Sequence, residues 1–436
     1  MQKTYSKYIS EISKIAAPII MGNLGFILIG VGDVIVAGRH STDTLAAISL
    51  ATAIINCITT FGIGILVSIS PILSNYRGAG KNPEKYFYPS LRFTAVLSVI
   101  ISAAILLFIP FIGKLGFSQN LTPLIKDYFF ITAFSVFGGY LHCMAKEFLQ
   151  AFEIVMFPNL LTIFCIFLNV ILNIIFVFGW GIIPEMGTPG LAIASLLVRY
   201  FMGIVLFLYC FKKVKVKNSN DRGYYKDMLK VGLPSSFAIM IEFVAFNLIT
   251  VLMGRISGAY AALQNIVCTI TTVSFMVPLA IGNATAVKVG FSNGAKEYSE
   301  LKKYAYTGLS ISVIFMALSA ICVAIAPGII LSLFTKDLYL IEIGVPVVYI
   351  LCFFQIFDGL QAALAGIFRG LKQTSIIMWA NFIAYWLVAI PLGCTFAFYY
   401  KLNLKGFWYG LIVSSIILCV IMFTNLMIKF KKMEVE

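Results

Sequence analysis

Three acidic residues of this 436-residue chain lie inside long apolar stretches, where an ionised side chain is costly. They are Asp33, Glu242 and Asp358. On insertion scales, a charged group in the middle of an apolar helix costs about 2.5–3.5 kcal/mol, so such a group needs a partner or a task. A buried carboxyl group can carry a proton or neutralise a bound cation. These residues are therefore the first candidates for cation or proton chemistry.

Asp33 shares its depth with polar residues of two other apolar stretches. Asp33 lies five residues before Gly38, Asn173 lies six residues before Gly179, and Ser195 lies five residues after Gly190, and these glycines lie at the same side of the membrane. Asn169 lies one helical turn from Asn173 on the same face. A carboxylate, two amide oxygens and a hydroxyl are hard ligands that suit a small cation such as Na+, or a proton. The alternative is that they only form hydrogen bonds between helices.

Glu242 and Asp358 form the second candidate group. Glu242 lies eight residues beyond Pro234, near the middle of its stretch, and Asp358 is similarly deep. Because neither has an obvious basic partner, we expect them to bind a proton, Na+ or a cationic substrate; the alternative is a hydrogen-bonded structural role. Arg199, four residues after Ser195, also lies in an apolar stretch. We expect a structural role for Arg199, because the sequence indicates no partner for it.

The elements that must position these groups are membrane-spanning helices. Hydrophobic residues make up 60% of the chain and charged residues 11%. Continuous apolar runs of this length cross about 30 Å of hydrocarbon as helices, and they lack the alternation of a membrane β-barrel. We predict an all-α polytopic protein with twelve spans, over residues 14–37, 46–73, 92–113, 127–148, 158–179, 188–210, 232–254, 261–287, 304–327, 343–365, 374–398 and 405–428.

The chain repeats itself with an offset of 216 residues, close to half its length. The residues that recur are Lys14, Pro18, Gly38, Arg39 and Ser41, which return as Lys230, Pro234, Gly254, Arg255 and Ser257. Repeated membrane proteins are usually transporters whose two halves move around a central site. We predict an N-lobe of residues 1–211, a basic cytoplasmic linker of residues 212–230 and a C-lobe of residues 231–436, with the pathway in a cleft between the lobes.

Basic residues predict the orientation in the membrane. The amino terminus, the connections after even-numbered spans and the carboxyl terminus hold 24 of the 32 Lys and Arg residues, and the odd-numbered connections hold seven. This asymmetry places both termini in the cytoplasm, in a plasma (cytoplasmic) membrane. The net charge of +14 is explained by orientation and by contact with anionic membrane lipids, so we expect no nucleic-acid partner.

The sequence offers little for enzyme chemistry. Its nine Cys residues show no metal-ligand spacing, and no Walker A or H-E-x-x-H motif is present. We therefore expect no enzyme activity and no cofactor beyond a coupling ion. A membrane-embedded transferase, the alternative from another class, would need an Asp-x-x-x-Asp or His-Asp pair near the membrane surface, and the sequence shows none.

Several short motifs, in order and on the expected spans, resemble the MATE family of multidrug and toxic compound extrusion transporters. The resemblance covers nearly the whole chain. The motifs are Gly-Asp-Val-Ile-Val-Ala-Gly-Arg at 32–39, the loop Pro-Glu-Met-Gly at 184–187, Ala-Leu-Gln at 262–264, Met-Val-Pro-Leu at 276–279, Val-Gly at 289–290 and Phe-Arg-Gly at 368–370.

The resemblance implies roles for both candidate groups. Glu242 and Asp358 match the acidic pair of the NorM-like branch, and Gln264 and Phe354 would lie near them as ion or substrate contacts. Two positions depart from the family. Leu263 stands where His is usual, and Phe354 stands where some relatives have Tyr, which keeps a π-face but loses a hydroxyl ligand.

The first group, Asp33, Asn169, Asn173 and Ser195, matches the N-lobe cation site of the family, with Ser195 where Thr is common. The resemblance further implies a V-shaped pair of pseudo-symmetric six-helix lobes. It implies a monomer that exports small organic cations as Na+ or H+ enters. The nearest alternative is a lipid-linked oligosaccharide flippase of the same superfamily, which usually has fourteen spans and a more cationic cavity.

Overall fold

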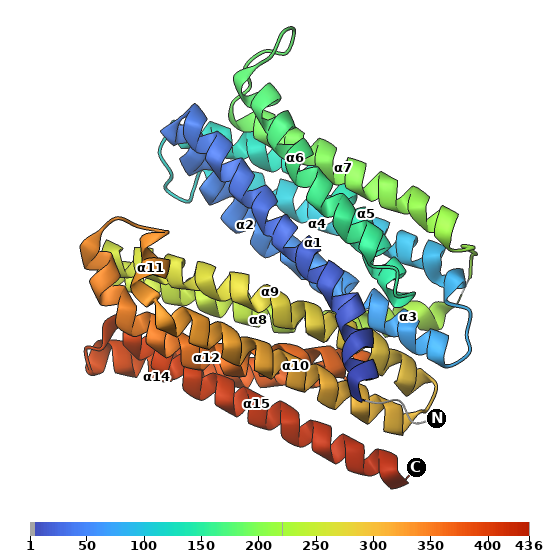
Figure 1. The fold of residues 1–436 in the computed structure, drawn as a ribbon. Coiled ribbons are helices and arrows are strands. Elements are labelled where there is room, and N and C mark those ends of the chain that lie inside the picture. Colours follow the sequence, from blue (N-terminus) through green and yellow to red (C-terminus); the bar gives the residue numbers. More distant parts are fainter. Residues whose placement is uncertain (1–4, 220, 436) are drawn as a thin grey trace. The chain divides into compact units, whose positions relative to one another are not determined.

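The computed structural model describes residues 5–219 and 221–435, and these residues are almost entirely helical (Figure 1). The first half holds α1 (Tyr5–His40), α2 (Thr42–Leu66), α3 (Ile69–Gly78), η1 (Pro83–Tyr86), α4 (Phe87–Ile112), α5 (Leu121–Ala151), α6 (Met156–Phe178) and α7 (Thr188–Lys213). The second half holds α8 (Arg222–Ile256), α9 (Gly258–Gly294), α10 (Tyr298–Ile325), α11 (Pro327–Ser332), α12 (Leu338–Gly370), α13 (Thr374–Asn381), η2 (Phe382–Ala389), α14 (Ile390–Cys394), η3 (Thr395–Tyr399) and α15 (Asn403–Val435).

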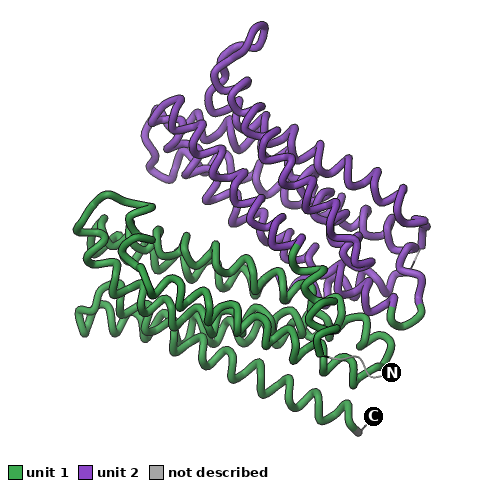
Figure 2. The backbone as a smooth tube through the Cα atoms, viewed as in Figure 1, with its two compact units in different colours: residues 1–17, 78–80, 237–436 green, residues 18–77, 81–236 purple. Residues whose placement is uncertain are grey.

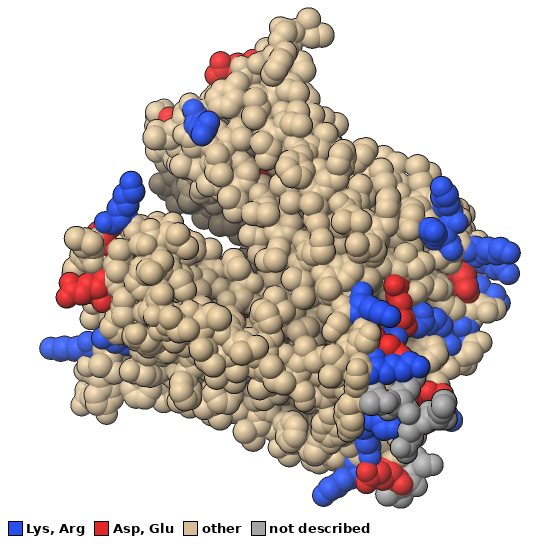
Figure 3. All heavy atoms as spheres, in the orientation of Figure 1, with Lys and Arg blue, Asp and Glu red and all other residues tan. Residues whose placement is uncertain are grey.

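Twelve helices, some built from two or more of these elements, are long and apolar enough to cross a membrane within the described residues. The prediction of twelve spans is confirmed. Lys, Arg, Asp and Glu side chains gather near the ends of the helices, and the broad middle of the visible surface carries almost none (Figure 3). An uncharged band of this kind is what contact with lipid tails requires.

The chain forms two compact units (Figure 2). Unit 1 contains the described parts of Met1–Ala17, Gly78–Gly80 and Phe237–Glu436, and unit 2 contains Pro18–Arg77 and Lys81–Ser236. The predicted lobes and the linker of residues 212–230 remain predictions. Residues 1–4, 220 and 436 of those ranges lie outside the described part of the chain.

The start of α1 packs within unit 1, although the rest of this helix belongs to unit 2. Tyr8 donates a hydrogen bond to Glu300 of α10 at 2.7 Å. Tyr304 of α10 donates another to Glu11. Lys288 of α9 forms an ion pair with Glu11 at 3.4 Å. These polar contacts hold the first turns of the chain to helices encoded by its second half.

The start of α8 makes the corresponding contacts within unit 2. Tyr224 shares a hydrogen bond with a serine hydroxyl of α4, and Tyr76 of α3 donates one to Asp227 at 3.0 Å. Tyr224 and Asp227 lie 216 residues after Tyr8 and Glu11, so equivalent residues of the repeat play equivalent parts. We call residues 5–17 and 222–236 the exchanged segments.

Each exchanged segment ends near an equivalent proline. Unit 2 begins at Pro18, inside α1, and unit 1 resumes at Phe237, three residues after Pro234 inside α8. A proline inside a helix removes one backbone hydrogen bond and favours a kink. Each helix therefore passes from one unit to the other close to its proline, where one backbone hydrogen bond of the helix is missing.

Part of the predicted linker is ordered against unit 2. The backbone N–H of Lys217 donates to the carbonyl oxygen of Glu84 at 3.0 Å. Tyr86 donates to Asp221 at 2.9 Å, and Arg92 donates to the side chain of Asn218 at 3.2 Å. The basic run therefore follows the surface of one unit over these residues.

Glycines allow the central helices of each unit to approach closely. In unit 2, a Cβ on Gly203 of α7 would lie 2.8 Å from the carbonyl oxygen of Gly138 of α5. In unit 1, a Cβ on Gly366 of α12 would lie 2.2 Å from the carbonyl oxygen of Gly282 of α9. Small residues at such crossings are typical of membrane helix packing. They fix the helices that carry the candidate residues.

Candidate cation-binding sites

The polar residues that the sequence places at one depth in the first half meet around Asp33 of α1 in unit 2. Asn173 of α6 donates from its Nδ2 to Asp33 Oδ1 at 2.6 Å and to Asn169 Oδ1 at 3.1 Å. Ser195 of α7 also hydrogen-bonds to the carboxylate, and the Asn169 amide lies beside it. Both asparagines are fully buried. We call these four residues the Asp33 cluster.

Arg199 completes the electrostatics of the Asp33 cluster. Its guanidinium donates a hydrogen bond to Ser135 of α5 at 2.7 Å and acts through space on the Asp33 carboxylate. Neither Ser135 nor Asp33 was predicted as a partner of Arg199. Its position four residues after Ser195, on the same face of α7, was the available signal. Its positive charge partly offsets the negative charge of the Asp33 carboxylate.

Two amide atoms of the Asp33 cluster are left without a partner. In the part of the chain that the structure describes, Asn173 Oδ1 and Asn169 Nδ2 are buried and accept or donate no hydrogen bond. Leaving a buried polar atom unpaired costs about 1–3 kcal/mol. Rotating the Asn173 amide by half a turn would bring its oxygen to the carboxylate. That contact is repulsive unless a cation or proton lies between the two oxygens, so the amide can respond to binding.

The second acidic group meets in unit 1. Gln361 of α12 donates from Nε2 to Glu242 Oε2 of α8 at 3.3 Å, and Tyr385 of η2 donates to Gln361 Oε1 at 3.3 Å. Tyr385 also hydrogen-bonds to Glu242, and Glu242 and Asp358 act on each other electrostatically. Because like charges repel, two carboxylates that act on each other away from water favour binding of a proton or a cation. We call these four residues the Glu242 cluster.

Sequence reasoning missed Gln361 and Tyr385. Gln361 lies three residues after Asp358 and therefore on the same side of α12, which was a usable signal. Tyr385 lies in a π-helical stretch, η2, that follows α13 in the eleventh span. π-Helical turns have no simple sequence signature and often occur at functional sites. Here the wider turn accompanies Tyr385 and Trp386, which both donate to groups of α8.

Gln264 and Phe354 lie in an aromatic group beside the Glu242 cluster. Gln264 Oε1 accepts a hydrogen bond from Trp408 Nε1 at 3.0 Å, so its amide oxygen is engaged with α15. Phe354 packs edge-on against Trp408, with ring centroids 5.3 Å apart. Phe246 contacts Phe354, Trp408 and Tyr385, with centroids 6.0–6.4 Å apart. Trp408 and Phe246 therefore connect Gln264 and Phe354 to Tyr385 of the Glu242 cluster.

The ligands available in the two clusters are oxygens. Over residues 5–219 and 221–435, no three His, Cys, Asp or Glu side chains converge to form a transition-metal site. The Asp33 cluster offers one carboxylate with neutral amide and hydroxyl groups, and the Glu242 cluster offers two carboxylates, an amide and a phenol. Such sets suit a proton or a hard monovalent cation.

The repeat coincides with the match to a known family. Residues 18–175 and 234–395 match the family model described as MatE. The chain belongs to the MatE family. The two matched segments begin at Pro18 and Pro234, the equivalent prolines of the repeat. The family resemblance is confirmed, and the chain is a multi-pass membrane transporter rather than an enzyme.

Relatives and solved structures cover the MatE chain almost completely. A probable multidrug resistance protein NorM from Photorhabdus laumondii is 25% identical over 435 residues, which cover 95% of this chain and 94% of the relative. The protein of the same name from Bacillus subtilis is 24% identical, with 93% and 92% covered. The eukaryotic MATE transporter AtDTX14 superposes with a TM-score of 0.88 over 98% of both chains, at 19% identity.

Another solved structure shows that the fold is compatible with different pocket chemistry. A transporter of the MOP superfamily from Pyrococcus furiosus superposes with a TM-score of 0.90 over 98% of this chain, at 19% identity. Its description reports a reverse polarity of the binding pocket and suggests a different function. At this identity the likeness establishes the fold, so function has to be argued from the clusters themselves.

Proposed function

We propose that this MatE transporter exports organic cations, including drugs, in exchange for Na+ or H+. The observation that carries the proposal is the buried acidic cluster within each unit. The groups that hydrogen-bond Glu242, Gln361 and Tyr385, are neutral and cannot balance its charge. The relatives named as probable multidrug resistance proteins, at 24–25% identity, support drug export.

The Glu242 cluster suits an amphipathic cation. Its carboxylates attract positive charge, while Phe246, Phe354 and Trp408 offer adaptable apolar and π surfaces. The Asp33 cluster suits a smaller coupling ion, because its ligands are short polar side chains and its asparagines are fully buried. In this proposal, ion binding and substrate binding favour opposite states of an alternating-access cycle.

We also propose that the transporter lies in the plasma membrane with both termini in the cytoplasm. Twelve spans return the chain to its starting side. The excess of Lys and Arg at the amino-terminal side supports a cytoplasmic location for that side. The connection between α1 and α2 would then face the outside.

Efflux of ethidium tests the function. Proteoliposomes loaded with ethidium should release it about tenfold faster when an opposing Na+ or proton gradient is imposed than without a gradient, and an ionophore that dissipates that gradient should abolish the difference. Running the two gradients separately identifies the coupling ion. Ethidium release that ignores both gradients would reject antiport of organic cations and leave a flippase as the better explanation.

The Tyr385 hydroxyl should matter for efflux. Tyr385→Phe removes hydrogen bonds to Glu242 and Gln361, and loss of a hydrogen bond to a charged group costs about 1.5–3 kcal/mol. We expect the apparent affinity for ethidium or the coupling ion to fall about tenfold. Tyr399→Phe, in the same span but exposed, is the matched control. Equal kinetics in both variants would show that the phenol plays no part in binding.

A further inference from the structure

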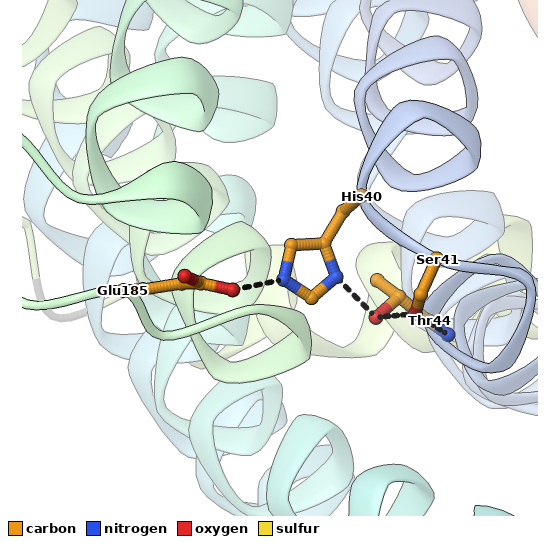
Figure 4. Close-up of polar contacts among 4 residues, drawn as sticks. All are labelled: His40, Ser41, Thr44 and Glu185. Atoms are coloured by element: carbon orange, nitrogen blue, oxygen red, sulfur yellow. Dashed lines mark hydrogen bonds and ion pairs between the residues drawn. The ribbon is translucent and has the colours of Figure 1, made fainter.

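His40, the last residue of α1, links three segments of the chain (Figure 4). His40 Nε2 lies 2.9 Å from Glu185 Oε1, in the loop between α6 and α7. His40 Nδ1 lies 2.8 Å from Thr44 Oγ1 of α2, and the Ser41 hydroxyl donates to the same Thr44 oxygen at 2.9 Å. All four residues belong to unit 2.

The hydrogen bonds around His40 suit both charge states of its ring. In the neutral ring with hydrogen on Nε2, this nitrogen donates to Glu185 and Nδ1 accepts from the Thr44 hydroxyl. In the protonated ring both nitrogens donate, so the bond to Thr44 reverses and the bond to Glu185 becomes an ion pair. The bond to the Glu185 carboxylate is charge-assisted in both states, and protonation of the ring adds the attraction between two opposite charges. Acid should therefore tighten the contact with Glu185.

The loop that carries Glu185 is shaped to meet the histidine. Gly179 and Gly187, at its two ends, have φ angles of 78° and 57°, a region that side-chain-bearing residues rarely adopt. A Cβ on Gly187 would lie 3.0 Å from His40 Cε1, so the backbone passes directly against the ring. Phe178, the last residue of α6, also packs near the His40 ring, with ring centroids 5.8 Å apart.

The same contact joins the helices of the Asp33 cluster. His40 follows Asp33 by seven residues on α1, which is about 10 Å of helix. The loop of Glu185 connects α6, which carries Asn173, to α7, which carries Ser195. Fixing His40 to Glu185 therefore fixes the three helices relative to one another just beyond their ion-binding side chains.

We propose that His40 and Glu185 form a pH-sensitive latch that positions Asp33 against Asn173 and Ser195. Between about pH 5 and 8 an imidazole changes its charge, so acid at this end of the transporter closes the latch and alkali loosens it. The ionisable groups nearest to His40 along the chain are Arg39 and Asp43, both exposed, and the Asp33 cluster one to two turns further in contributes Asp33 on α1 and Arg199 on α7. The effect on ion binding rests on the proposed function, whereas the latch itself does not.

Nuclear magnetic resonance can observe the latch without any transport assay. The chain has only two histidines, so His142→Gln leaves His40 as the single ring signal in 13C-histidine-labelled protein. Glu185→Gln removes the carboxylate that faces Nε2, so the response of the His40 ring signal to pH should differ from that of the parent. Asp43→Asn removes an exposed carboxylate of the next helix and should leave this response closer to that of the parent.

Hydrogen exchange tests whether the contact restrains the helices. After correction for intrinsic rates, amides of residues 34–40 and 179–187 should exchange about threefold more slowly at pH 6 than at pH 8. His40→Gln, which keeps hydrogen-bonding capacity but no titratable charge, should remove this pH difference. We expect a modest factor because the Glu185 side chain is 67% exposed.

The outcomes separate the two proposals. An unchanged His40 titration in Glu185→Gln, or an unchanged pH difference in His40→Gln, would overturn the latch. If both measurements succeed, ion-coupled efflux should depend on pH in the parent more steeply than in His40→Gln. A parent protein that moves no ethidium under any gradient would reject the proposed function and leave these two measurements standing.

Discussion

Glu242→Gln and Asp358→Asn should each abolish ethidium efflux while the protein remains folded. Each substitution keeps the shape of the side chain and removes its charge. Removing a carboxylate that pairs with a bound cation should cost about 2–5 kcal/mol of binding, a factor of about 30 or more. Expression should be unaffected, because a neutral amide is easier to bury than a carboxylate in this site.

The mutual influence of the two acids sharpens this expectation. Because Glu242 and Asp358 act on each other electrostatically, the double variant should lose little more activity than either single variant. Glu342→Gln is the control, since Glu342 lies on α12 like Asp358 but is exposed. Efflux near the parent level in both single variants would exclude the Glu242 cluster from transport.

Asp33→Asn should remove the dependence of efflux on the coupling ion. The substitution preserves an oxygen that Asn173 can reach, so the helices should stay in place. The charge that attracts the ion is lost, and ion-stimulated release of bound ethidium should fall to the rate without a gradient. The measurement is ethidium release from proteoliposomes at increasing concentrations of the ion identified as above.

Asn173→Ala provides the second arm of this test. It removes the amide that can turn its oxygen toward Asp33, so the affinity for the ion should fall about tenfold. Asn56→Ala, an exposed asparagine of α2, serves as the matched control. If Asp33→Asn and Asn173→Ala bind the ion as the parent does, the Asp33 cluster only holds helices together.

The convergence on Asp33 could be predicted because it needs little more than helix geometry. The rise of a helix converts distance from a span end into depth in the membrane. Asp33, Asn173 and Ser195 share that depth, and the structure brings them together with Asn169. The roles of these residues in ion binding remain predictions.

Other parts of the sites depend on packing that no single segment encodes. Arg199 finds Ser135 only because α5 and α7 cross at small residues. Tyr385 reaches Gln361 from a π-helical stretch, whose register the apolar pattern does not reveal. The family motif indicated a role for Gln264 near Glu242 and Asp358. Its side-chain oxygen instead accepts a hydrogen bond from Trp408, which lies 144 residues further along the chain. Such pairings are decided by neighbours distant in sequence.

The linker illustrates the same limit in a polar segment. Charge alone indicated a solvated connection over residues 212–230. Lys217 and Asp221 nevertheless contact Glu84 and Tyr86, because the chain must follow the surface of unit 2 to reach the exchanged segment of α8. The linker contacts unit 2 because it leads to the exchanged segment of α8, which packs there. The composition of the linker does not predict these contacts.

The exchanged segments bear on how such a chain could have arisen. A protein made of one repeat would carry the equivalents of Tyr8 and Glu11 but would hold its own first turns poorly, since those turns pack on the other repeat. Two copies of it could satisfy each other reciprocally, as a domain-swapped dimer. Gene duplication and fusion would then turn an exchange between two molecules into the exchange seen within one. Each half expressed alone should accordingly depend on its counterpart for assembly.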